Sequence, residues 1–205
     1  MNPRTLTLFH NPQSRSAGVR VLLEALDAPY DVKLIDLKAG QQRQPEFLAL
    51  NPLGKLPTLR HGEAIVTEQV AIFLYLADLF PAAGLAPAIN DPLRGPYLRW
   101  MAFYGACFEP AVTDVAMKRE PMDRSNSPYG NFDDVLKTLT DQLERGRYLL
   151  GDTLTAADIL WASALRWTTG FGLVPKLPVI TAYIDEVCEH PAFARAAALD
   201  AEAAA

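Results

Sequence analysis

The run from residue 51 to residue 76 holds the residues whose types and spacing predict a binding site. Its Asn-Pro-x-Gly turn leads into a short strand at Leu56-Pro57, and a tight reversal follows before a helix opens at Glu68-Gln69. Proline cannot donate to a sheet ladder, so we expect the Leu56-Pro57 bond to be cis. The bend would present the backbone N–H and C=O of Leu56 to an extended peptide. Since the helix start offers free N–H groups to an anion, the run predicts a site for a small peptide with a carboxylate.

This run resembles the glutathione-binding segment of cytosolic glutathione transferases. The shared pattern is Asn-Pro-x-Gly-x-hydrophobic-Pro, a hairpin, and an acidic residue that precedes a helix containing Ala-Ile. The resemblance covers nearly the whole chain, and it implies a bacterial member of the serine type or an atypical relative of the cysteine type. The implied reaction is activation of the glutathione thiol and its conjugation to an apolar electrophile.

The resemblance also implies roles for single residues of this run. Leu56 would pair through its backbone with the cysteinyl part of glutathione, and Pro57 would be the cis residue. Glu68 and Gln69 would hold the γ-glutamyl end. Gln69 stands where the family usually has Ser, and its amide can still donate to a carboxylate. Lys55 either approaches the glycyl carboxylate or is only a solvated turn residue.

Activation of a thiol requires stabilisation of its thiolate. A free thiol with a pKa near 8.5 is only a few per cent ionised at neutral pH, and lowering that pKa by about two units takes roughly 2.7 kcal/mol. A hydroxyl that hydrogen-bonds the anion supplies about 1.5–3 kcal/mol, and a helix N-terminus adds about 0.3–1 kcal/mol. The loop before the first predicted helix carries two such hydroxyls, on Ser14 and Ser16.

On the residues alone, these two serines would be helix caps. The serine-type branches of the family place the activating hydroxyl in this loop, so Ser14 is the first candidate and Ser16 the second, with Asn11 or His10 behind them. Arg15 is a third, because it stands at or beside the cysteine of the cysteine-type branch and could stabilise the thiolate as a cation. His10 is interpreted as a hydrogen-bonded residue at a strand end rather than as a base. Phe9 and His10 leave no tyrosine at that strand end.

The elements that must position these residues follow from hydrophobic periodicity. A β-rich run over 5–9, a helix with its apolar face from Val19 to Leu26 and an alternating strand over 30–36 form a βαβ unit. The opening run adds two strands and a helix, which completes a thioredoxin-like arrangement. Pro and Ala punctuate residues 81–92, so we expect a glutathione-binding α/β domain over 1–80, a linker over 81–92 and an all-α helical bundle with the acceptor pocket over 93–205.

The second half of the chain shows helical patterns only. Pro110 should bend or break the long helix near residue 109. Thr155 and Asp158 form a capping box at a later helix start, and we interpret Asp158 as structural. Most aromatic side chains here are expected in the core, but Tyr104 and Phe108, one turn apart, are the best candidates for lining an acceptor pocket.

Composition restricts the other function classes. The 205 residues carry a formal net charge of −5 without a basic stripe, which disfavours nucleic acid. No apolar run reaches the length of a membrane span and no signal peptide opens the chain, so cytoplasmic residence is expected. Cys107 and Cys188 are far apart, which leaves neither a metal cluster nor a redox pair.

The resemblance implies an enzyme of detoxification, a glutathione transferase that works as a homodimer and needs no cofactor beyond glutathione as co-substrate. A glutathione-dependent isomerase, dehalogenase or peroxidase is an alternative within the same chemistry. A binding or scaffold protein that keeps the fold is an alternative from another class. A thiol–disulfide oxidoreductase is disfavoured, because no cysteine stands near the first helix.

Overall fold

The computed structural model describes residues 5–120 and 122–204 of the chain. Residues 1–4, which open the first predicted domain, and residues 121 and 205 lie outside that part. By its contacts the chain divides into two compact units. One unit runs to Ala83 and includes the segment from His190 onward, and the other extends from Gly84 to Glu189. Each is described here by itself.

The first unit has the predicted thioredoxin-like order of strands and helices. Its sheet has the order β2-β1-β3-β4, in which β2 is parallel to β1, while β3 is antiparallel to both β1 and β4. Its elements are β1 (Leu6–His10), α1 (Ser16–Ala25), β2 (Tyr30–Leu34), η1 (Gln41–Arg43), α2 (Pro45–Leu48), β3 (Thr58–His61), β4 (Ala64–Val66), α3 (Gln69–Leu79), η2 (Pro81–Ala83) and α9 (Pro191–Ala204). The fold class expected for this half of the chain is therefore confirmed.

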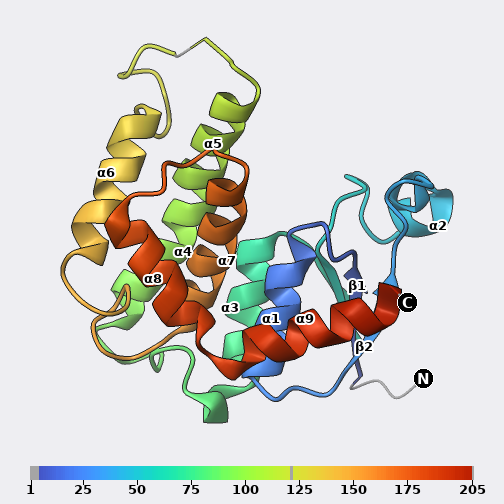
Figure 1. The fold of residues 1–205 in the computed structure, drawn as a ribbon. Coiled ribbons are helices and arrows are strands. Elements are labelled where there is room, and N and C mark those ends of the chain that lie inside the picture. The colour runs from blue at the N-terminus through green and yellow to red at the C-terminus, as the bar shows by residue number, and fades with distance from the viewer. Residues whose placement is uncertain (1–4, 121, 205) are drawn as a thin grey trace. The chain divides into compact units, whose positions relative to one another are not determined.

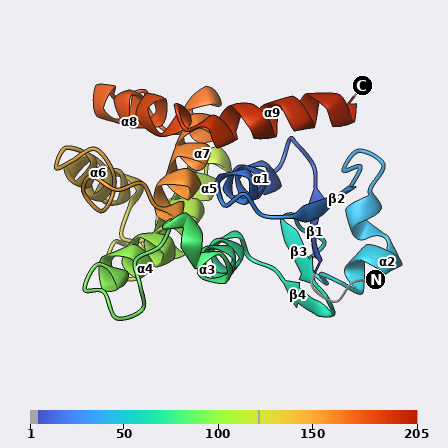
Figure 2. The ribbon, with the colours of Figure 1, turned by 90° about the horizontal axis from the view of Figure 1, so that it is seen from below.

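Helices cover both faces of this sheet. Figure 2 shows α1 and α3 on one face and α2 on the other. Every residue of β1 is buried, as expected for a central strand that is covered on both sides. On the α2 side, Phe9, Ile35 and Phe47 form an apolar cluster against which Leu56 also packs. The central strand therefore ends, at His10, inside well-packed surroundings.

The last helix, α9, belongs to the first unit. The sequence pattern predicts that residues 93–205 form one bundle. Instead, α9 packs along α1 (Figure 1) and belongs to the unit that contains the sheet. Small buried side chains, Ala192 and Ala196, allow this close approach. Arg195 adds a polar link by donating to the backbone carbonyl of Glu24 at 2.7 Å. An Ala-rich sequence shows helix propensity but not which partner its apolar face will select.

The second unit is helical, as predicted. Within its described residues the elements are α4 (Arg94–Phe103), the π-helical turn η3 (Tyr104–Phe108), α5 (Glu109–Ala116), α6 (Phe132–Leu143), α7 (Ala156–Gly170) and α8 (Pro178–Cys188). The break expected near residue 109 takes the form of the π turn. Pro110 then lies in the first turn of α5, directly after the π turn, and has no N–H with which to continue the hydrogen bonding of that turn.

The capping box at the start of α7 is present. The carboxylate of Asp158 accepts from the backbone N–H and the hydroxyl of Thr155, both at 2.8 Å. It also accepts from the N–H of Leu149 and the hydroxyl of Tyr183. Burial raises the pKa of Asp158, and the four hydrogen bonds lower it by a smaller amount. The group ties three segments together, in keeping with the structural role expected of it. None of the helices in the described ranges is long and apolar enough to cross a membrane.

Candidate functional site

The Leu56-Pro57 segment has the geometry that the sequence predicts. The bond is cis, and Pro57 is buried directly before β3. The preceding turn is braced by Asn51, whose amide donates to the carbonyl of Lys55 at 3.0 Å and to the hydroxyl of Thr58 at 3.2 Å. Within the described chain, neither the N–H nor the C=O of Leu56 has a protein hydrogen-bond partner. This backbone can therefore pair with an extended ligand.

The start of α3 carries backbone strain at one of the predicted binding residues. Glu68 has φ 65° and ψ 119°, in a region that residues other than glycine rarely adopt, and its side chain is exposed. Such a conformation costs on the order of 1–3 kcal/mol and is concentrated at functional sites. The next residue, Gln69, directs its side-chain amide to the carbonyl of Arg15 at 3.1 Å. The first turn of α3 is thereby joined to the loop between β1 and α1.

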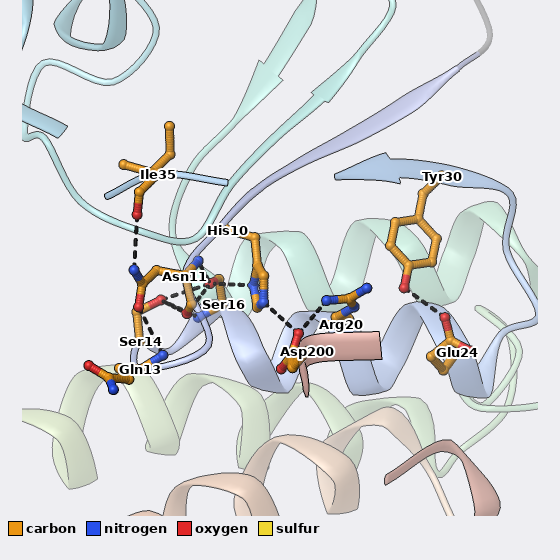
Figure 3. Close-up of polar contacts among 10 residues, drawn as sticks. All are labelled: His10, Asn11, Gln13, Ser14, Ser16, Arg20, Glu24, Tyr30, Ile35 and Asp200. Atoms are coloured by element: carbon orange, nitrogen blue, oxygen red, sulfur yellow. Dashed lines mark hydrogen bonds and ion pairs between the residues drawn. The ribbon is translucent and has the colours of Figure 1, made fainter. Parts of the chain in front are cut away.

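That loop, residues 11–15, places its two serines differently (Figure 3). The hydroxyl of Ser14 is partly exposed and lies 2.9 Å from the carbonyl of Asn11 and 2.7 Å from the hydroxyl of Ser16. Ser16, the first residue of α1, is fully buried. Its hydroxyl accepts from the N–H of Asn11 at 3.0 Å and lies 2.8 Å from Nδ1 of His10. Only Ser14 of the two can reach a ligand.

His10 continues this line of polar groups into the protein. Its Nε2 lies 2.9 Å from Oδ1 of Asp200, on α9, and the same carboxylate oxygen is paired with Nη1 of Arg20, on α1. In Figure 3 five side chains follow one another in space, each in contact with the next: Ser14, Ser16, His10, Asp200 and Arg20. We call these five residues the serine–histidine chain. Burial is the main cause that lowers the pKa of His10, so its imidazole is neutral at pH 7.

The neutral imidazole settles which way the hydrogen bonds run. A carboxylate that is paired with arginine has no proton to donate, so Nε2 of His10 carries the hydrogen and donates to Asp200. Nδ1 then has only a lone pair, and the hydroxyl of Ser16 donates to it at 2.8 Å in preference to the other acceptor within reach, the carbonyl of Asn11 at 3.1 Å. Because that hydroxyl has one hydrogen, Ser16 is committed inward and cannot also donate to a ligand.

The other sequence-predicted residues have varied positions. Arg15 is exposed at the N-terminus of α1, and Lys55 is exposed in the turn before Leu56. The register of β1 and β3 pairs Phe9 with Thr58, so the segment just before β3 lies where β1 ends and the serine loop begins. The structure thus brings the segment at Leu56, the serine loop and the start of α3 into one region of the first unit.

Tyr104 and Phe108 do not look like pocket residues. Their exposed fractions are 2% and 1%, and both rings contact Trp161 within the second unit. The hydroxyl of Tyr104 bonds the carboxylate of Glu109. Such burial leaves almost no surface for a ligand, so it argues for a core role and removes the support for an acceptor pocket at these two positions.

Sequence reasoning did not find Asp200 or Arg20, and it interpreted His10 as a hydrogen-bonded residue at a strand end rather than as a base. Asp200 lies in an Ala-rich run without any motif, and its partners are 190 and 180 positions away. No local signal could have revealed this. The one available signal was His10 itself, an ionisable residue placed where β1 must end, next to two serines.

Comparisons with known proteins give a consistent result. Residues 4–78 match the family described as Glutathione S-transferase, N-terminal domain, and residues 112–191 match its C-terminal domain. The chain is 41% identical to Glutathione S-transferase 1 of Dianthus caryophyllus over 85% of this chain and 83% of the relative, and 30% identical to Glutathione S-transferase GST-4.5 of Xanthomonas campestris over 82% and 85%. Among solved structures it is similar to a glutathione transferase from Methylococcus capsulatus, with a TM-score of 0.81 and 26% identity over 96% and 99% of the two chains.

Proposed function

This chain belongs to the glutathione S-transferase family, and we propose that it binds glutathione through the first unit, stabilises the thiolate through Ser14 and transfers the sulfur to an apolar electrophile. The single observation that carries the assignment of the thiol site is the difference between the two serines. Ser14 is the loop hydroxyl that is partly exposed, whereas Ser16 is buried and bonded to His10.

Glutathione is an extended peptide with a carboxylate at each end and a free amino group, and the proposed contacts follow that chemistry. The unpaired backbone of Leu56, beside the cis Pro57, would bind the cysteinyl part as an added strand. Glu68 would bind the amino group of the γ-glutamyl end, and Gln69 with the N–H groups that open α3 would bind its carboxylate. Lys55 would approach the glycyl carboxylate from the exposed turn.

Ser14 supplies enough stabilisation for the thiolate. A hydrogen bond from a hydroxyl to an anion contributes about 1.5–3 kcal/mol, which corresponds to one to two pKa units of the thiol. The backbone of the serine loop leads directly into α1, so the positive end of that helix adds about 0.3–1 kcal/mol. On this basis we place the protein among the serine-type members, and Arg15 serves as an additional cation near the sulfur.

We also propose that the protein works as a homodimer in the cytoplasm. Isologous pairing of two copies is the most common symmetry of soluble oligomers. The acceptor is an apolar electrophile of the kind removed by detoxification, and its binding residues lie outside the pair Tyr104 and Phe108, which are buried.

The test is retention on immobilised glutathione followed by turnover assays. The protein should bind the resin, elute with free glutathione and conjugate at least one member of a panel of aromatic chlorides, epoxides and isothiocyanates; peroxides in the same panel test the peroxidase alternative. Elution without turnover of any compound would favour a scaffold protein with the same fold. Failure to bind glutathione would contradict both readings.

A further inference from the structure

The serine–histidine chain extends beyond what thiolate stabilisation requires. A hydroxyl that only donates to a thiolate needs no buried base behind it. Here Ser14, Ser16 and His10 form consecutive contacts of 2.7 and 2.8 Å, and His10 meets Asp200 at 2.9 Å. The free energy of burying an imidazole beside a carboxylate and an arginine is unfavourable unless the groups are paired.

We infer that the serine–histidine chain is a proton relay, through which His10 accepts the proton that the bound thiol loses. This inference rests on the proposed function, because Ser14 must contact the sulfur for the relay to begin there. His10 and Asp200 act through the two hydroxyls and touch no part of glutathione.

The resting contacts allow hydrogen bonds in the required direction, with the carbonyl of Asn11 as a competing acceptor 2.9 Å from the hydroxyl of Ser14 and 3.1 Å from that of Ser16. His10 donates from Nε2 to Asp200, Ser16 donates to Nδ1 of His10, and Ser14 can donate to Ser16 at 2.7 Å. The oxygen of Ser14 accepts from the backbone N–H of Ser16 at 3.2 Å, and its second lone pair can accept from the S–H group of glutathione. Ser16 keeps all its bonding capacity in use, because its second lone pair accepts the N–H of Asn11.

Transfer moves three protons by one position each. The S–H bond breaks as Ser14 takes that proton, the hydrogen of Ser14 passes to Ser16, and the hydrogen of Ser16 passes to Nδ1 of His10. The products are a thiolate that accepts a hydrogen bond from Ser14 and an imidazolium that faces Asp200. Atoms and charge balance, since one anion and one cation form from two neutral groups, and no other reactant is needed.

The charges around His10 suit a transient acceptor. Asp200 on α9 stabilises the imidazolium, while Arg20 on α1 opposes it. Among the described residues, Asp200 and Arg20 are the charged groups that act on the ring. Leu34 of β2 pairs with His10, and Lys33 of β2 and Arg60 of β3 lie over the ring of Phe9 instead. The lowered pKa keeps His10 neutral and ready to accept at pH 7, and it prevents the proton from being held permanently.

The sharpest variant is His10→Asn. Its side-chain amide can still accept a hydrogen bond from Ser16, but it cannot take up a proton. The second variant is Asp200→Asn, which removes the negative charge that stabilises the imidazolium. Asp200 is partly exposed, so this change disturbs the fold less than a change at a buried residue. The matched control is Arg195→Met, which removes another polar link between α9 and α1 and leaves the serine–histidine chain intact.

The measurement is the rate at which the thiolate absorbance appears after rapid mixing with glutathione, in H2O, D2O and their mixtures. We expect about a ten-fold or greater loss of rate in His10→Asn, a smaller loss in Asp200→Asn and no change in Arg195→Met. The dependence of the wild-type rate on the deuterium fraction should be curved, because several protons move together, and it should become linear in His10→Asn. A merely structural role would not change that curvature.

The outcomes separate this inference from the proposed function. If Ser14→Ala raises the thiol pKa while His10→Asn and Asp200→Asn keep the wild-type rate and curvature, the relay is overturned and the proposed function stands. If Ser14→Ala leaves the thiol pKa unchanged, Ser14 does not contact the sulfur and the relay fails with it. Slower thiolate formation in His10→Asn with glutathione affinity unchanged in calorimetry supports the relay.

Discussion

The side-chain amide of Gln69 donates to the backbone carbonyl of Arg15 at 3.1 Å, across 54 positions of sequence. This bond joins the first turn of α3 to the loop that carries Ser14. The two predicted parts of the glutathione site, one for the γ-glutamyl end and one for the thiol, are therefore connected by a protein hydrogen bond before any ligand binds.

Gln69→Ala should weaken both glutathione binding and turnover. A neutral hydrogen bond of this kind contributes about 0.5–1.5 kcal/mol, so the affinity should fall from a few-fold to about ten-fold, and kcat should fall because the serine loop loses an anchor. Calorimetry and steady-state kinetics measure the two effects. Glutathione affinity lowered with kcat intact would mean that the bond to Arg15 does not position Ser14.

Glu68→Gln should weaken glutathione binding about ten-fold or more, because a charged contact with the amino group of the ligand is worth about 1.5–3 kcal/mol. Glutamine keeps the size of the side chain at this strained position, where φ is 65°. Glu63→Gln, in the exposed hairpin turn, is the control and should bind as the wild type does. Equal affinities in calorimetry would remove Glu68 from the site.

Ser14→Ala should raise the pKa of bound glutathione by one to two units, through the loss of about 1.5–3 kcal/mol of thiolate stabilisation. Turnover at neutral pH should fall and then recover as the pH rises. Ser16→Ala should instead lower the free energy of unfolding by about 1–3 kcal/mol, because His10 and the N–H of Asn11 lose a buried partner. Ultraviolet titration of the bound thiolate distinguishes the two, and a raised pKa in Ser16→Ala alone would transfer the role to Ser16.

The stability of the protein should depend on the protonation of His10. Burial lowers its pKa from the ordinary value of 6.5, so the unfolded chain binds this proton more readily than the folded chain. The contribution of His10 to the free energy of unfolding is therefore full above about pH 6.5 and is lost progressively as the pH falls below that value. The free energy of unfolding, measured with urea at each pH from 5 to 8, should rise less steeply with pH in His10→Asn than in the wild type. The pKa of His190 is also lowered by burial, but His190 is present in both proteins and cancels in the difference. Parallel slopes would contradict this assignment.

One chain has a mass of 22.5 kDa, and sedimentation at micromolar concentration should give twice that mass. The expectation comes from the family and from the prevalence of two-fold symmetric oligomers. A protein with the mass of a single chain at that concentration would refute the homodimer.

The parts of this structure that the sequence predicts are those with local signals. The Pro and Gly turn, the Leu56-Pro57 bond, the start of α3 at Gln69 and the cap formed by Asp158 all depend on residues within a few positions of one another. The serine loop could be placed in the same way, since its residues lie between a strand and a helix.

The remainder depends on distant pairing. The choice between Ser14 and Ser16 follows from burial, which periodicity does not resolve for two polar residues two positions apart. The role of His10 depends on Asp200, and nothing in an Ala-rich helix that also carries Glu202 indicates that Asp200 will meet the end of β1. Tyr104 and Phe108 show the same limit, because an aromatic pair one helical turn apart fits a core as well as a pocket.

The position of α9 has a consequence for the order in which the chain can fold during synthesis. The second unit is continuous in sequence, so all its described helices are available once residue 189 has emerged. The first unit is discontinuous, and β1, α1 and the sheet are made long before the helix that packs on α1. Until α9 arrives, the apolar face of α1 and the buried end of β1 lack their final cover, and chains with transiently exposed apolar surface are prone to aggregate. Truncation before Pro191 should therefore yield less soluble protein as well as an inactive one, even though every residue proposed to touch glutathione would still be present.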